Sequence, residues 1–77
     1  MKFKCLVNRT LHHTEEDLSL EALQRFVDAI EEVAGRPIIA FKGMPEVYAQ
    51  VKPYLPLNVP FYVVRREPNT LYGVLEL

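Results

Sequence analysis

Residues 36–67, RPIIAFKGMPEVYAQVKPYLPLNVPFYVVRRE, decide the fold because they predict a strand, a short helix and a second strand in succession. Residues 38–41 are continuously apolar, which suits a strand buried on both faces. Residues 61–64 are aromatic and β-branched, which suits another strand. Between them, Pro45 fits the first turn of a helix, and two later prolines end that helix early. A unit of this kind favours two parallel strands joined by a right-handed crossover.

The residues before this unit predict one strand and one amphipathic helix. Residues 1–7 alternate between apolar and other side chains, as in a strand with one buried face. Residues 19–34 follow the 3.6-residue period of a helix with one apolar side. Either Thr14 or Ser19 could cap the start of this helix, and Gly35 suits its end. Between strand and helix, residues 8–14 are polar and predict a loop.

After the central unit, the segment Glu67-Pro68-Asn69-Thr70 has the composition of a turn. It predicts a hairpin in which residues 71–77 run antiparallel to residues 59–66. Gly73 interrupts this last strand, which indicates either a bulge or a close packing contact.

The predicted element order is therefore β-α-β-α-β-β, in one small domain covering residues 1–77. The predicted class is a two-layer α/β sandwich, with a four-stranded mixed sheet and two helices. Two helices cannot cover both faces of such a sheet, so one face is expected to be open. An open face that carries Leu6, Tyr62 or Tyr72 would suit a homodimer.

A fold-level alternative comes from Asn58-Val59-Pro60-Phe61 and the strand, turn and strand that follow. This arrangement resembles the proline-then-hairpin half of the thioredoxin fold, in which the proline is cis. The predicted element order is also similar to that fold without its last helix. The resemblance implies a truncated thioredoxin-like domain as an alternative. No Cys-x-x-Cys motif follows the first strand, where residues 8–13 (NRTLHH) stand instead, so redox activity is not implied.

Composition narrows the classes of function. The chain has 77 residues, is 49% hydrophobic and carries a formal net charge of −1. This charge gives no general attraction to nucleic acid or to an anionic membrane. A single cysteine excludes an internal disulfide. The sequence shows no signal segment and no apolar run of membrane-spanning length, so a cytoplasmic location is expected.

Basic and polar residues follow three of the predicted strands. If those strands are parallel, their carboxyl ends share one edge of the sheet, where ligands of open α/β sheets bind. The residues expected at this edge form a candidate anion site: Asn8, Arg9, His12, His13, Lys42, Gly43, Arg65 and Arg66. Free backbone N–H groups near Gly43 would add to it.

Two functions remain open from the sequence. The first is a non-enzymatic binding or regulatory module that acts on a protein partner or a small anion. The second is a phosphate-ester hydrolase or nuclease at the carboxyl edge, with His12 or His13 as acid or base beside Arg9, Lys42 and Arg65. The spacing HHxEE fits no familiar pattern of metal ligands, so neither a metal nor another cofactor is expected.

Overall fold

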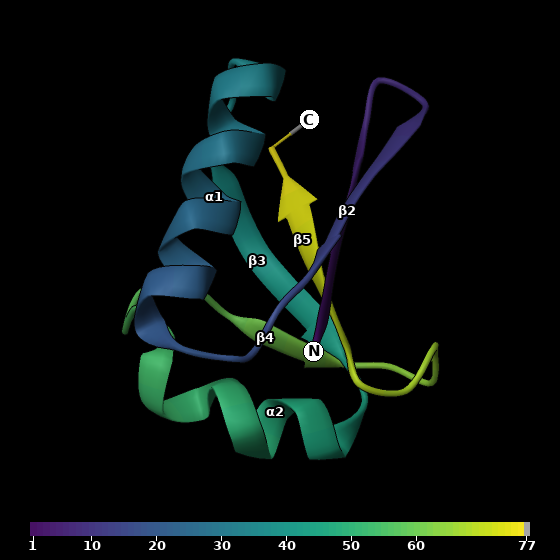
Figure 1. The fold of residues 1–77 in the computed structure, drawn as a ribbon, viewed down its shortest axis with the longest axis vertical. Coiled ribbons are helices and arrows are strands. Elements are labelled where there is room, and N and C mark those ends of the chain that lie inside the picture. Colours follow the sequence, from purple (N-terminus) through teal and green to yellow (C-terminus); the bar gives the residue numbers. More distant parts are fainter. Residues whose placement is uncertain (77) are drawn as a thin grey trace.

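The computed structural model describes residues 1–76 as a five-stranded sheet with two α-helices (Figure 1). In chain order the elements are β1 (Lys2–Val7), β2 (Thr10–Glu15), α1 (Leu20–Ala34), β3 (Ile38–Gly43), α2 (Pro45–Val51), the 3₁₀ turn η1 (Lys52–Tyr54), β4 (Phe61–Val63) and β5 (Thr70–Leu75). The mixed α/β class predicted from the sequence is confirmed. The predicted number of strands, four, is wrong because the polar segment after β1 forms a fifth strand.

The sheet has the strand order β2-β1-β5-β3-β4. β1 is antiparallel to β2 and parallel to β5, and β5 is antiparallel to β3. The expected parallel pairing of β3 with β4 is confirmed. The N–H of Phe41 donates to the Pro60 carbonyl at 3.0 Å, and the N–H of Val64 donates to the Gly43 carbonyl at 2.9 Å.

The predicted hairpin between β4 and β5 is wrong. The turn expected at residues 67–70 does form, with Asn69 at a φ of 54°, but β5 then enters the sheet between β1 and β3. The run LYGVL at residues 71–75 supplies apolar side chains to both faces, which suits a central strand. β4 and β5 are not neighbours in the sheet, so the hairpin of the thioredoxin-like alternative is not formed. All peptide bonds described within residues 1–76 are trans, so its cis proline is not present there either.

The loop expected at residues 8–14 is instead a tight turn followed by β2. Asn8 and Arg9 adopt positive φ angles of 48° and 71°. Positive φ at both central residues is the pattern of the two-residue turn that matches the twist of a hairpin. The strand lacks an alternating apolar signal because five of its six residues are exposed, which is why its sequence resembles a loop.

Both helices cover the same face of the sheet, so the molecule has two layers (Figure 1). Phe26 of α1 packs on Phe3 of β1 with ring centroids 5.4 Å apart. Cys5 is a buried member of this core, and burial raises the pKa of its thiol. The largest fully buried side chains are Phe3, Phe41, Leu71, Val47, Val51, Thr70 and Cys5. No helix within residues 1–76 is long and apolar enough to cross a membrane.

Local signals fix the ends of the helices as the sequence predicts. The Ser19 hydroxyl accepts the N–H of Ala22 at 3.0 Å, and Gly35 ends α1 at a φ of 67°. Pro45 begins α2. One acidic residue of α1 is structural: the Glu31 carboxylate accepts the N–H of Ile38 at 2.8 Å and so ties α1 to the start of β3.

Two glycines allow close packing inside the sheet. A Cβ atom on Gly73 would lie 3.2 Å from Ile38 Cδ1 and 3.4 Å from Phe26 Cε2. The close packing contact is one of the two explanations that the sequence offered for Gly73. A Cβ atom on Gly43 would lie 3.0 Å from Val47 Cγ1 and 3.2 Å from the Thr70 carbonyl oxygen.

Gly43→Ala is therefore expected to destabilise the protein by about 1–3 kcal/mol, because the new methyl group meets backbone that cannot move away. Gly73→Ala is the matched control, since its methyl group meets only side chains, and it should cost less. Urea unfolding of both variants measures the difference. An equal or larger loss in Gly73→Ala would contradict the packing described here.

Candidate functional site: the open face of the sheet

The face of the sheet away from the helices carries a continuous row of polar and aromatic side chains. Strand register places one residue of each strand in this cross-sheet row, in the order His13, Lys4, Tyr72, Lys42 and Tyr62. Neighbouring strands lie about 4.8 Å apart, so adjacent side chains of the row can contact one ligand together. From Lys4 onward, lysine and tyrosine alternate along the row.

A groove of about 640 Å³ lies on this face around Tyr72. Its floor includes the apolar side chains of Leu6, Leu11 and Val74, together with Tyr72. Four cations line it, namely Arg9, Arg36, Lys42 and Arg66. We refer to this feature as the cationic groove. Leu6 is 64% exposed and Leu11 is 48% exposed, so the apolar floor is open to a ligand.

Within residues 1–76, no carboxylate forms an ion pair with a cation of the groove. The three ion pairs there involve Lys2, Lys4 and Arg25 instead. Arg66 lies over the ring of Tyr72, with 5.4 Å between the guanidinium carbon and the ring centroid. Arg36 instead donates to the Glu76 carbonyl at 3.2 Å and to Asn8 Oδ1 at 3.4 Å. Lys42, Arg66 and Arg9 are therefore the cations most available to a ligand.

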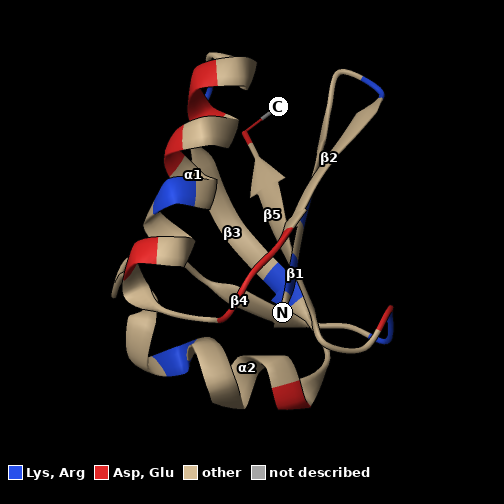
Figure 2. Ribbon diagram, viewed as in Figure 1, with Lys and Arg blue, Asp and Glu red and all other residues tan. Residues whose placement is uncertain are grey.

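Charge is segregated between the two layers of the molecule. Acidic residues concentrate on α1, whereas basic residues gather on the strands and loops of the sheet (Figure 2). Four of the ten acidic residues lie on α1 and one lies on α2, whereas Glu15 lies on β2 in register with Lys2. The net charge of −1 therefore conceals a positive open face and a negative helix layer. Such a separation attracts anionic ligands to one face only.

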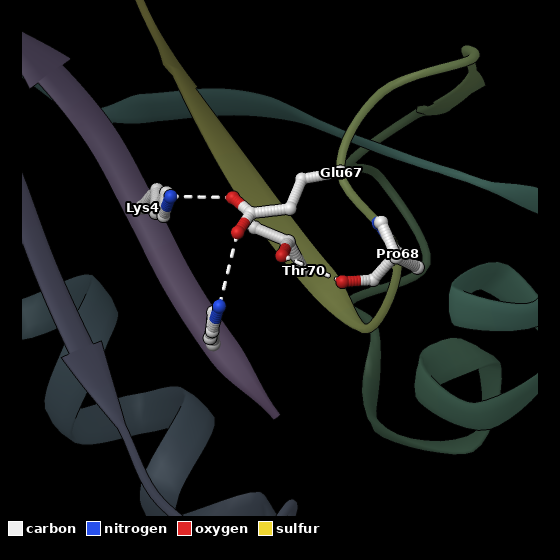
Figure 3. Close-up of polar contacts among 5 residues, drawn as sticks. Lys4, Glu67, Pro68 and Thr70 are labelled. Carbon is white, nitrogen blue, oxygen red and sulfur yellow. Dashed lines mark hydrogen bonds and ion pairs between the residues drawn. The ribbon is translucent and has the colours of Figure 1, made fainter.

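Glu67 organises the edge of the open face next to the groove (Figure 3). Its carboxylate bridges the ammonium groups of Lys2, at 3.0 Å, and Lys4, at 2.5 Å. These bonds, with Lys4 contributing most, lower the pKa of Glu67 below its ordinary value of 4.5. The same contact raises the pKa of Lys2 above 10.5. Thr70 Oγ1 donates to the Pro68 carbonyl at 3.0 Å and fixes the turn that carries Glu67.

Arg9 has a left-handed backbone conformation, which is unfavourable for a residue with a Cβ atom. A left-handed φ costs a residue with a Cβ atom roughly 1–2 kcal/mol, and glycine is the usual choice at this position of such a turn. The turn aims Arg9 into the cationic groove beside Leu6 and Leu11. Strain that persists at an exposed residue of this kind is typical of functional positions.

The shared carboxyl edge expected from the sequence does not exist. β1 runs antiparallel to β3 and β4, because both β1 and β5 point opposite to β3. Asn8 and Arg9 therefore follow β1 at the opposite end of the sheet from Gly43 and Arg65. The open face nevertheless brings four of the eight predicted residues together in the cationic groove, namely Asn8, Arg9, Lys42 and Arg66.

The other four predicted residues lie elsewhere. Gly43 is buried and packed against Val47, as described above. Arg65 lines a separate depression near the start of α2. His12 pairs with Cys5 and so faces the helix layer, whereas His13 pairs with Lys4 and faces the open side.

The structure does not assemble the histidine-and-cation cleft that the hydrolase hypothesis requires. His13 is three strands away from Lys42 along the cross-sheet row, a separation of about 14 Å at the usual strand spacing. His12 lies on the other face. Within residues 1–76, no three His, Cys, Asp or Glu side chains come close enough to hold a metal ion.

Sequence reasoning missed Arg36 and Leu11 as members of the open face. The sequence places Arg36 only at the start of the strand–helix–strand unit, and it places Leu11 in a predicted loop. Alternation alone could have found Leu11, because Leu11 and His13 are two residues apart and so share a face once β2 is recognised as a strand. The position of Arg36 depends on the pairing of distant strands and has no local signal.

A scan of the sequence against protein-family models found no match, and searches among curated proteins and solved structures found none either. The geometry and charge of the open face are therefore the basis for a proposal about function.

Glu67→Gln is expected to lower the thermal midpoint at neutral pH, because the ionised carboxylate is the form that Lys2 and Lys4 stabilise. A lowered pKa in the folded state stabilises the protein above the ordinary pKa of 4.5, and this contribution disappears as the pH falls through the folded value. The melting difference between the wild type and the variant should therefore shrink on acidification. Glu76→Gln serves as the control, and a difference that is constant with pH would contradict this role of Glu67.

Proposed function

We propose that this protein is a non-enzymatic binding module that uses its open sheet face to hold an acidic segment of a protein partner. One observation carries the proposal: Arg9, Lys42 and Arg66 surround an exposed apolar floor, and no carboxylate of residues 1–76 neutralises them. Complementary charge would steer such a partner to this face and away from the acidic helix layer.

The composition of the groove favours a protein segment over a small inorganic anion. A small anion requires converging donors, whereas here the cations are separated by Leu6, Leu11 and the ring of Tyr72. An amphipathic acidic segment could place an apolar side chain on this floor and carboxylates against the surrounding cations. Tyrosine and arginine, which both occur here, are the residues enriched at the centres of protein interfaces.

The first test is an amide NMR titration with a synthetic peptide that alternates glutamate and leucine. Shifts are expected at Leu6, Lys42 and Tyr72 and not along α1. A peptide with glutamine in place of glutamate should bind more weakly, and raising the ionic strength should weaken the glutamate peptide. Inorganic phosphate and a short single-stranded oligonucleotide are titrated in parallel.

Lys42→Ala and Arg66→Ala are each expected to weaken binding of the glutamate peptide by about two- to fivefold, the usual effect of a partly exposed charge pair. Lys52→Ala is the matched control, because Lys52 is an exposed cation outside the groove, beside Tyr48. It should leave the affinity unchanged. Equal losses in all three variants would indicate attraction to net charge alone and would overturn the proposed site.

Two other outcomes would contradict the proposal. Shifts at the open face with the oligonucleotide but not with the peptide would assign the face to nucleic acid. An absence of shifts with every probe at millimolar concentration would remove the open face as a binding site for anionic ligands.

A further inference from the structure

The two edges of the sheet differ in how well they are protected against pairing with another strand. β4 forms one edge, has only three residues and is preceded by Pro60, so it offers little backbone for pairing. β2 forms the other edge and has six residues, without a proline or lysine. Short strands, prolines and lysines are the common ways to block an edge, and β2 has none of them.

The hairpin geometry shows which backbone groups of β2 are free. Val7 and Thr10 face each other next to the two-residue turn and form the first hydrogen-bonded pair, so even-numbered residues of β2 bond to β1. The bond from the Glu16 N–H to the Met1 carbonyl, at 3.2 Å, continues this pattern beyond the strand. The N–H and C=O groups of Leu11, His13 and Glu15 therefore point outward from this edge, in the plane of the sheet.

We propose that this edge pairs with β2 of a second copy of the chain, antiparallel and centred on His12. In an antiparallel pair related by a two-fold axis perpendicular to the sheet, odd-numbered residues face odd-numbered residues of the copy. A centre at His12 brings Glu15 of the second copy next to Arg9, which lies in the turn directly before β2 and not in the strand itself. The two-fold symmetry repeats that contact, so the interface contains two ion pairs.

In this register, a charged residue of one copy lies next to a residue of opposite charge in the second copy. Arg9 and Glu15 are both exposed, and neither forms an ion pair within residues 1–76. The same register places Leu11 beside His13 of the copy. The neighbouring register, centred on His13, would instead place Leu11 opposite Glu15 and bring Arg9 level with Asp17, which lies beyond the end of β2. Opposite charges on neighbouring strands stabilise their pairing, and of these two registers the one centred on His12 brings Arg9 next to an acid of β2 itself, so it is favoured.

The resulting dimer would have one continuous ten-stranded sheet, since each copy contributes the five strands described above. Both helix layers would lie on one side, and both cationic grooves would lie on the other. This dimer does not depend on the proposed binding of an acidic segment, because its contacts are made by the edge of β2 in the absence of any ligand.

Exchange of the two charges tests the register. Sedimentation velocity from micromolar to millimolar concentration should show a monomer–dimer equilibrium in the wild type. Arg9→Glu and Glu15→Arg should each raise the dissociation constant about tenfold or more, because two attractive contacts become repulsive. Glu46→Arg on α2, which packs near the opposite edge, is the matched charge control and should dimerise normally.

An equimolar mixture of Arg9→Glu and Glu15→Arg gives the decisive result. Both cross-strand contacts in the mixed dimer regain opposite charges, so the mixture should dimerise with about the wild-type affinity although each variant alone does not. The double variant should also recover. Circular dichroism confirms that each variant is folded.

A wild type that remains monomeric at millimolar concentration would overturn the proposal. A dimer that is insensitive to both charge reversals, or single variants that do not recover on mixing, would overturn it as well, because the contact would then lie on another surface. Glu15 does not line the groove, so the Glu15→Arg result is independent of the peptide titration, whereas Arg9 belongs to both surfaces.

Discussion

The central position of β5 is the constraint on which the rest of this structure depends. β5 joins two parts that are otherwise separate in the chain, the β1–β2 hairpin and the β3–α2–β4 unit, because it pairs with β1 on one side and β3 on the other. Gly73 lies where β5 packs most closely against its neighbours. Its missing side chain leaves room for Ile38, Phe26 and Cys5, which belong to three different elements. The core of a chain this short is closed by its last strand.

The placement of both helices on one face determines what the opposite face of the sheet exposes. A sheet covered on one side leaves its other side to solvent, and here that side holds tyrosines, exposed leucines and cations. Five of the ten acidic residues lie on α1 and α2, which together carry one basic residue, so the two faces of a nearly neutral protein differ in charge (Figure 2). The net charge alone gives no sign of this separation, which arises from the arrangement of the charged residues in the folded protein.

At the candidate site, the sequence indicates some of the residues but not how they are arranged. The sequence predicts Arg9, Lys42 and Arg66 as ligand-binding residues near strand ends, and the structure brings these three into one groove. The prediction assumes parallel strands, and this assumption is wrong because the strands that precede these residues are not all parallel. They meet across the open face and not along an edge. His12 and His13 are adjacent in the chain and lie on opposite faces of β2, since consecutive residues of a strand alternate.

The sequence by itself determined the local structure. The extent and caps of α1, the start of α2 at Pro45, the turn at Asn69 and the parallel pairing of β3 and β4 all follow from residues close together in the chain. Only the tertiary structure decided that β2 is a strand, that β5 is central and that Glu67 bridges Lys2 and Lys4 (Figure 3). The physical reason is the range of the interactions. Caps, turns and periodicity act within a few residues, whereas strand order depends on packing between residues as far apart as Lys4 and Glu67, and a local pattern cannot distinguish between the strand orders that satisfy it equally well.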